Sequence, residues 1–264
     1  MTQPELSASV PLALSSTLSW RAEHACLNAW PALSNVFHDG WVARFADGLT
    51  RRANSVNPLH GGATMDGPSL QFFENLFRGH DLPLIIRMPW LLDPVVDRRL
   101  DQLGYQAEGE SRTIYGEIGS LLAQPDPAAR IQSEADEAWL SLIHGMQGRT
   151  PAQSEIYEDI IQSIAVPAAF ASLREEGEVV AMAYAVLDGD LLCCESVVTG
   201  ARHRGKGFGR RLMSALFHWA QVNQATGACL QVESQNAAGL ALYRSLGMAT
   251  ELHRYHYRRL PRDQ

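Results

Sequence analysis

The chain has 264 residues, which is enough for one large domain or for two domains of ordinary size. Apolar residues make up 46% and charged residues 19%, so the composition predicts a buried core and argues against wholesale disorder. The formal net charge of −7 argues against a protein whose main task is to bind nucleic acid. Charged residues interrupt every apolar stretch well before it reaches the ~20 residues of a membrane span.

Residues 1–16 lack the basic start of a signal peptide, and we expect them to form a flexible tail. Further along the chain, two prolines flank Asp126, which suits an extended linker. We therefore predict a first domain at 17–123, a linker at 124–128 and a second domain at 129–264.

In the first domain we predict strands at 41–46 and 49–56, joined through a turn at 47–48. A strand at 82–88, a helix at 92–103 and a strand at 112–117 follow. Arg51, Arg52 and Asn54 could line an acceptor site that straddles both halves of the chain. They could equally fix the hairpin and the contact between the domains, and we favour this second interpretation.

The second domain is predicted as alternating helices and strands that form a mixed sheet covered by helices, an α/β (α+β) fold. We expect Asn236 to cap the last helix and Gly247 to end it. The helices are expected at 135–146, 153–164, 209–222 and 237–246, and the strands at 168–173, 179–187, 191–198, 228–232 and 255–260.

The four cysteines show no C-x-x-C spacing. Cys193 and Cys194 are adjacent in an apolar run, so a strand would point them to opposite faces. We interpret all four as buried, reduced thiols and expect a cytoplasmic protein without a metal ion.

A glycine-rich turn at 197–212 links a strand to a helix, with glycines alternating at 205, 207 and 209. Glycine leaves amide groups uncovered, and a helix start adds unpaired N–H groups and a partial positive charge. This combination suits a phosphate, although the glycines could also only turn the chain. The pattern is neither a Rossmann fingerprint nor a P-loop. The basic residues beside it are Lys206, Arg210 and Arg211.

The segment Arg204-x-x-Gly207-x-Gly209 resembles the pyrophosphate-binding motif of the GNAT N-acetyltransferases. The preceding residues 196–198 resemble the splayed strand that pairs with the pantetheine arm in that family. Residues 230–248 resemble the family's other cofactor-side motif, a strand, an asparagine, a helix with Leu-Tyr, and a glycine before a large apolar residue.

The first domain resembles a degenerate second copy of the same fold. This copy lacks the R-x-x-G-x-G turn. The resemblance therefore implies a tandem, two-domain GNAT protein, in which each domain has a mixed, mostly antiparallel sheet flanked by helices. Its degenerate N-terminal half would not bind the cofactor well.

The resemblance implies acetyl-CoA as cosubstrate and direct transfer of the acetyl group to an amine, without an acyl-enzyme. A backbone N–H at Val198 or Thr199 could polarise the thioester carbonyl. Asn236 could line the cofactor site or only cap its helix. The residues placed at the cofactor are Val197, Val198, Arg204, Gly205, Lys206, Gly207, Phe208, Gly209, Arg210 and Asn236.

Two side chains are candidates for proton transfer. Tyr243, which shares a helix face with Asn236, would protonate the departing thiolate, although it could be an ordinary half-buried aromatic. A free amine is mostly protonated at neutral pH, so its attack needs a base. Glu195 is the candidate, because partial burial would raise its pKa toward the useful range; the alternative is an edge glutamate facing water.

The acceptor is expected to be a small-molecule amine or a protein or peptide amine, with neither nucleic acid nor membrane as a partner. The resemblance implies that 137–165 and 251–256 shape its pocket. The oligomeric state is left open. Two other functions compete with catalysis: a noncatalytic acyl-CoA-binding regulatory module, and a structural tandem domain in which the glycines only turn the chain.

Overall fold

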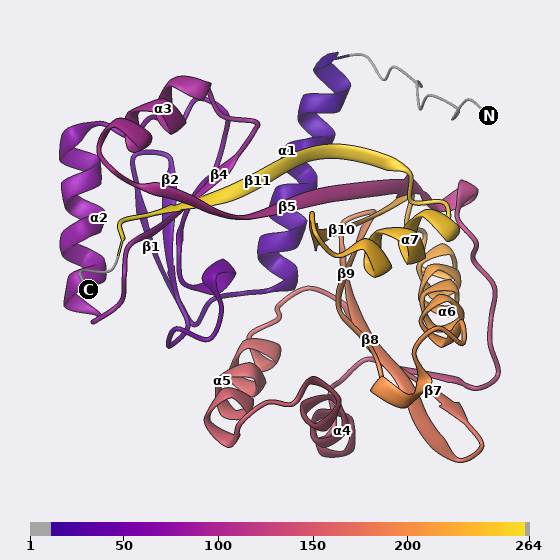
Figure 1. Cartoon of the computed structure of the whole chain (residues 1–264). Coiled ribbons are helices and arrows are strands. Elements are labelled where there is room, and N and C mark those ends of the chain that lie inside the picture. Colours follow the sequence, from indigo (N-terminus) through magenta and orange to yellow (C-terminus); the bar gives the residue numbers. More distant parts are fainter. Residues whose placement is uncertain (1–11, 262–264) are drawn as a thin grey trace.

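The computed structural model describes residues 12–261, with side chains from residue 17 onward (Figure 1). The helices are α1 (Leu12–Ala29), α2 (Gly67–Gly79), α3 (Pro94–Gln102), α4 (Glu137–Gln147), α5 (Pro151–Gln162), α6 (Phe208–Val222) and α7 (Ala237–Ser245). The strands are β1 (Ser34–His38), β2 (Trp41–Phe45), β3 (Val56–Pro58), β4 (Ile85–Pro89), β5 (Gln106–Glu117), β6 (Ala129–Gln132), β7 (Ala168–Glu175), β8 (Glu178–Asp188), β9 (Leu191–Thr199), β10 (Gly227–Glu233) and β11 (Thr250–Arg259).

All these strands join in one sheet with the order β1-β2-β3-β4-β11-β5-β10-β9-β8-β7-β6. The pairs β3–β4 and β9–β10 are parallel, and the other neighbours are antiparallel. The predicted mixed, mostly antiparallel α/β fold is therefore confirmed. The expectation of a separate sheet in each domain is wrong, because β5 and β11 run through both halves (Figure 1).

The order of elements repeats along the chain. The run β1-β2-β3-α2-β4-α3-β5 is followed, after β6 and two helices, by β7-β8-β9-α6-β10-α7-β11. The last strands of the two runs are exchanged, since β5 pairs with β10 of the second run and β11 pairs with β4 of the first. The repeat supports a tandem protein, and the exact domain boundary at 124–128 stays a prediction.

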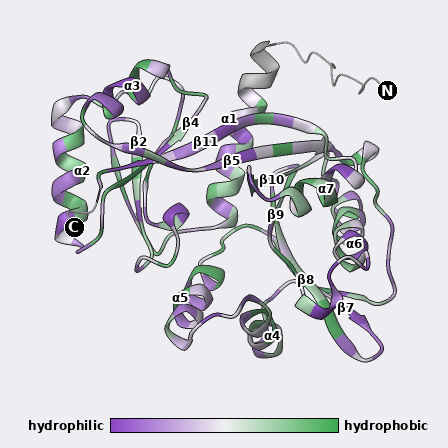
Figure 2. Cartoon of the chain, in the orientation of Figure 1, coloured by the Kyte–Doolittle hydropathy of each residue, from purple (hydrophilic) through white to green (hydrophobic). Residues whose placement is uncertain are grey.

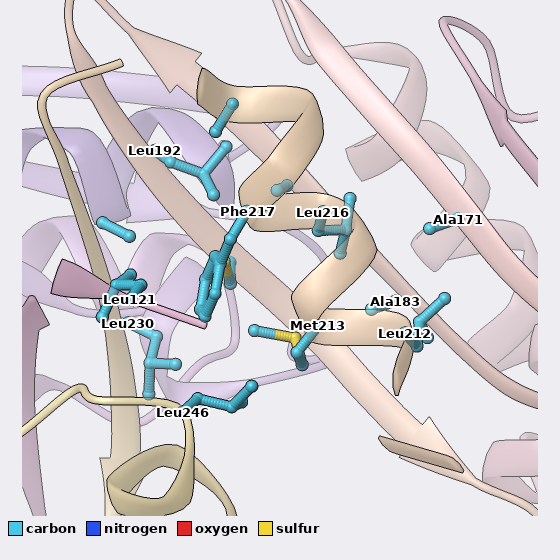
Figure 3. Packing of buried hydrophobic residues seen from close by; sticks show 14 of the residues in the cluster. Leu121, Ala171, Ala183, Leu192, Leu212, Met213, Leu216, Phe217, Leu230 and Leu246 are labelled. Carbon is cyan, nitrogen blue, oxygen red and sulfur yellow. The ribbon is translucent and has the colours of Figure 1, made fainter. Parts of the chain in front are cut away.

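Helices cover the two faces of the second run. On one face α6 contacts β7, β8 and β9, and on the other α1 contacts β8, β9 and β10. Figure 3 shows Leu212, Met213, Leu216 and Phe217 of α6 directed at strand residues such as Leu192. Figure 2 shows hydrophobic and hydrophilic residues alternating along α2 and α5, as expected of helices with one buried face. Among the described residues, no helix is long and apolar enough to span a bilayer.

Helix α1 is the largest element that the sequence analysis missed. Its buried side includes the small residues Ala22, Ala25, Cys26 and Ala29, so the sequence shows no stripe of large apolar side chains. Residues 12–16, which we placed in the tail, begin this helix, and residues 1–11 lie outside the described residues. Three further elements were not predicted, because they are short or begin at a Gly-Pro pair: β1, α2 and β6.

The strand predicted at 49–56 is wrong over most of its length. A 3-10 turn occupies 51–53, and β3 begins only at Val56. The Thr50 hydroxyl accepts a hydrogen bond from the Ala53 amide at 3.4 Å. The Asn54 side chain accepts from the amides of Ala46 and Gly48 and donates to the carbonyls of Ala46 and Thr50. These side-chain bonds replace the strand ladder.

A buried charge cluster fastens α1 to strands of both runs. Glu23 forms a two-pronged ion pair with Arg87 of β4, and its Oε1 lies 2.5 Å from Nε2 of His253 on β11. Gln231 of β10 donates to the same oxygen at 3.1 Å. Burial opposes ionisation of Glu23, but the charges and hydrogen bonds of Arg87 and His253 outweigh it and hold its pKa well below the usual range.

We predict that Glu23→Gln lowers the free energy of unfolding by about 3–5 kcal/mol, because Arg87 then stays buried without a counterion. Urea unfolding at neutral pH measures this loss, with Glu155→Gln on the exposed side of α5 as control. Since the folded pKa of Glu23 is depressed, its stabilisation is present above the ordinary pKa near 4.5 and fades as the pH falls below it. Equal stability of Glu23→Gln and wild type would contradict this role.

Candidate functional site

Strands β9 and β10 separate at the centre of the sheet. Their parallel pairing covers only Leu191–Cys193 against Gly227–Cys229. Beyond it, β9 continues to pair with β8 as far as Thr199, and β10 continues to pair with β5 as far as Glu233. The inner edges of both strands are therefore left without a strand partner, and such an edge can bond to an extended ligand.

A β-bulge lies where the two strands diverge. Tyr184 of β8 is opposite Glu195, but Met182 is opposite Val198, so β9 carries one residue more than β8 over this stretch. Ser196 in the bulge has a φ of 52°, in the left-handed region. A bulge re-aims the side chains beside it and leaves backbone groups outside the ladder. Glu195 is consequently placed at an irregular point of the strand.

A groove of about 710 Å³ runs from the end of β9 over the start of α6 to α7. It is lined by Val197, Val198, Arg204, Gly205, Gly207, Phe208, Gly209, Arg210, Asn236 and Tyr243 of the predicted site residues. Lys206 is exposed and does not line this groove. The structure thus brings together nearly all the residues that the two sequence motifs single out.

The N-terminus of α6 is open to the groove. Gly207 precedes the helix with a φ of 82°, and no side chain caps it. The Arg211 amide makes the first bond of the helix, to the Gly207 carbonyl at 3.1 Å, so the three preceding amides have no partner among the described residues. A Cβ on Gly209 would lie 3.2 Å from Oγ1 of Thr199, so a larger residue there would make Thr199 shift by a few tenths of an ångström. These features fit an anionic group.

The corresponding helix of the first run, α2, is closed. The Asp66 side chain accepts a hydrogen bond from the Ser69 amide at 2.8 Å, and Pro68 in the first turn supplies no N–H. A carboxylate of the chain itself therefore already bonds to the start of α2, whereas the start of α6 has no such cap. This supports the prediction that the N-terminal half does not bind the cofactor well.

Glu195 forms a buried, bidentate ion pair with Arg52. The Arg52 nitrogens Nη1 and Nη2 donate to Oε1 and Oε2 of Glu195 at 2.5 and 2.9 Å. Glu195 is only 6% exposed, whereas the Arg52 side chain retains 21%. Burial raises the pKa of Glu195, and the Arg52 guanidinium opposes this rise. Glu195 is therefore not the water-facing edge residue that we considered as an alternative.

The three polar residues singled out in the first domain have different positions. Asn54 fixes the loop through its four backbone hydrogen bonds, as the structural interpretation predicted. Arg51 lies 3.3 Å from Glu108 and over the Tyr257 ring. Arg52 alone reaches the candidate base. Sequence analysis missed that contact because the partners are 143 positions apart and no local pattern links them.

Tyr243 lies on α7 at the edge of the groove and is 8% exposed. Its hydroxyl has no hydrogen-bond partner within residues 17–261. Burial raises the pKa of Tyr243, so the phenol stays protonated at neutral pH and can act as a donor. Asn236 caps α7, since its Oδ1 accepts from the Gly239 amide at 2.9 Å, and it also lines the groove. Both interpretations of Asn236 therefore hold together.

We expected Arg211 to add free charge beside the glycine turn, and the structure shows that this expectation is wrong. Its guanidinium bonds to Asp126 at 2.8 Å and to Glu175 at 2.7 Å, which fastens the predicted linker to β7. Helices α4 and α5, which fall within the segment expected to shape the acceptor pocket, approach the bulge. The Tyr157 hydroxyl lies 3.3 Å from the Ser196 hydroxyl, and Arg149 lies over the Tyr157 ring.

The two adjacent cysteines point to opposite faces, as predicted: Cys194 packs with α6, and Cys193 packs beneath α1. There the sulfurs of Cys26, Cys193 and Cys229 all lie within 4.8 Å of one another. Three thiols could hold a metal ion, but they fall one short of the four ligands of structural zinc sites. The absence of a metal stays a prediction.

A family model described as "Probable histone acetyltransferase Rv0428c C-terminal" matches residues 19–258. An uncharacterized N-acetyltransferase, YobR of Bacillus subtilis, is 25% identical over 244 residues, covering 90% of this chain and 97% of that protein. The probable histone acetyltransferase Rv0428c of Mycobacterium tuberculosis is 28% identical over 243 residues, covering 90% of this chain and 72% of that protein.

Solved structures share the fold at low sequence identity. A GCN5-related N-acetyltransferase from Kribbella flavida matches with a TM-score of 0.69 and 15% identity, covering 95% of this chain and 96% of that chain. A tandem GNAT protein from the clavulanic acid biosynthesis pathway matches with a TM-score of 0.58 and 12% identity, covering 72% and 68%. At these low sequence identities, the similarity shows a shared fold and nothing more.

We predict that the four cysteines, all free and buried, do not react with a thiol reagent in the native protein and titrate as four thiols after unfolding. Elemental analysis of the purified protein should find no stoichiometric zinc or copper. Retention of one metal ion per chain, lost in a Cys193→Ser variant, would instead assign a metal site to the three clustered thiols.

Proposed function

Because this chain belongs to the family described as probable histone acetyltransferase Rv0428c C-terminal, and is an N-acetyltransferase of the GNAT superfamily, we propose that it transfers acetyl from acetyl-CoA directly to an amine. The observation that carries this proposal is the open groove at the uncapped start of α6, which is lined by Val197 and Val198 of the diverging strand β9 and by Tyr243 of α7. Glu195 does not line this groove but lies two residues before Val197 on β9. The acceptor is a small-molecule amine or a protein or peptide amine.

The groove fits coenzyme A in its chemistry. The amides of 208–210 and the side chains of Arg204 and Arg210 would bind the diphosphate. The pantetheine arm carries amides, and the free inner edge of β9 at Val197 and Val198 offers backbone partners for them. A backbone N–H at Val198 or Thr199 would polarise the thioester carbonyl.

In the proposed reaction the amine nitrogen attacks the thioester carbonyl carbon, and the bond from that carbon to sulfur breaks. Glu195 accepts a proton from the nitrogen, and the Tyr243 hydroxyl donates its proton to the departing sulfur. Solvent then returns a proton from Glu195 to Tyr243, so the net transfer is from nitrogen to sulfur. The Arg52 pair leaves lone pairs on both Glu195 oxygens, because a carboxylate has about four acceptor positions.

We predict that Gly207→Ala weakens coenzyme A binding about tenfold, because a Cβ at a φ of 82° strains the loop that presents the amides. Calorimetric titration measures this affinity. The matched control is Gly148→Ala at the end of α4, where φ is 64° and, as at Gly207, the added Cβ meets no neighbour. Equal losses of affinity in the two variants, or none in either, would count against the groove as the cofactor site.

We predict that Tyr243→Phe and Glu195→Gln each lower kcat/KM by roughly 100-fold or more while coenzyme A affinity is kept, since each removes one proton-transfer group. Release of free thiol from acetyl-CoA over an amine panel measures the rates. Tyr105→Phe, which alters a hydroxyl bonded to Glu74 in the first run, is the control and should keep full activity.

The pH dependence of kcat/KM distinguishes the role of Glu195 as base from the role of Tyr243 as acid. Since burial raises the pKa of Glu195 above its ordinary value of 4.5, wild-type kcat/KM should fall as the pH drops through that raised value, and Glu195→Gln should lack this limb. Rates of Tyr243→Phe equal to wild type would remove Tyr243 from the chemistry. Tight coenzyme A binding without thiol release on any amine would favour the noncatalytic acyl-CoA-binding module.

A further inference from the structure

A second cavity, of about 500 Å³, lies where the two runs meet. The loop at 48–52 forms one wall, and the strands β5, β10 and β11 supply the others. Its lining is rich in groups that bind polar ligands, namely Arg51, Arg52, Ser111, Gln231, Glu233 and Tyr255. None of these residues lines the groove at α6, so the two cavities have separate linings, and Arg52 of this one holds Glu195.

Arg52 belongs to both the cavity and the candidate base. A guanidinium carries five N–H donors, and Glu195 takes two of those on Arg52. The Nε–H and the second hydrogens of the two terminal nitrogens have no partner among residues 17–261. The Arg52 side chain is 21% exposed, and its Nε atom is not fully buried. Arg52 can therefore bind an anion from the cavity while it holds Glu195.

The proposed reaction creates a need for such an anion. When Glu195 accepts the proton of the amine it becomes neutral, and Arg52 is left as a largely buried cation without a counterion, which is costly. Before that step, an ammonium ion that docks at Glu195 would add a second positive charge beside Arg52. An anionic group on the acceptor balances the charge at both stages. A carboxylate also matches the planar donor pattern of a guanidinium.

We infer that the acceptor is an amine that also carries a carboxylate, which Arg52 binds from this cavity while the amine reaches Glu195. This inference rests on the proposed acetyltransferase function and specifies its substrate class as amino acids or short peptides with a free carboxyl end. Arg52 is then a specificity determinant supplied by the N-terminal half, which otherwise lacks a cofactor site.

The direct test compares matched acceptors with the wild-type protein. Thiol release from acetyl-CoA is measured for a series of L-amino acids and dipeptides and for their carboxamides, at equal concentrations of free amine. We expect kcat/KM to be about 10- to 100-fold higher for the carboxylates. This is the change expected because the carboxamides lose a hydrogen bond between two charged groups. Equal rates for both series would overturn the inference. A preference for phosphoethanolamine over the amino acids would also overturn it, in favour of a phosphate-bearing amine.

Variants assign the preference to Arg52. In Arg52→Gln the kcat/KM values for the carboxylates and for the carboxamides should both fall, because Arg52 also positions Glu195. The ratio of the carboxylate value to the carboxamide value should drop toward one. Arg98→Gln, on the exposed side of α3, is the control and should keep the wild-type ratio. Coenzyme A affinity, measured alongside, confirms that the variant is folded. A ratio unchanged in Arg52→Gln would show that another group binds the carboxylate.

The same measurements distinguish failure of the proposed function from failure of the proposed substrate class. If neither series is acetylated while another amine of the panel is, the substrate class is wrong and the proposed function stands; if no amine of the whole panel is acetylated, the proposed function is wrong. If amines are acetylated without regard to their carboxylate, the proposed function stands and only the substrate class is wrong.

Discussion

The ion pair between Arg52 and Glu195 is the contact on which the account of the site depends. Taking both charges out of water is costly, and only close, two-pronged geometry offsets that cost. Arg52 comes from the loop between β2 and β3, and Glu195 comes from the bulge in β9. The N-terminal half therefore takes part in the site, since it sets the charge beside the group proposed to accept the proton.

The exchange of the last strands holds this contact in place. Because β5 joins the second run and β11 joins the first, the halves cannot separate without breaking the centre of the sheet. The buried cluster around Glu23 adds a polar fastening between α1, β4 and β11. The two runs also differ at one decisive place: Asp66 caps α2, whereas Gly207 leaves the start of α6 open. The repeated fold thus has one open helix start and one closed one.

Local sequence patterns predicted what local geometry decides. The uncapped helix start after Gly207, the cap formed by Asn236 and the opposite directions of Cys193 and Cys194 all follow from a few neighbouring residues. Contacts between distant segments left no such pattern. The partner of Glu195 and the exchange of β5 and β11 depend on pairings across more than a hundred residues. Helix α1 was missed because its buried face is built from small side chains.

A crystal structure with coenzyme A bound would show whether the groove at α6 directs the cofactor to Glu195 and Tyr243. We expect the diphosphate on the amides of 208–210, the pantetheine arm along β9, and the sulfur between Glu195 and Tyr243, with the Arg52–Glu195 pair intact. Coenzyme A bound elsewhere, or a sulfur remote from both side chains, would contradict the account.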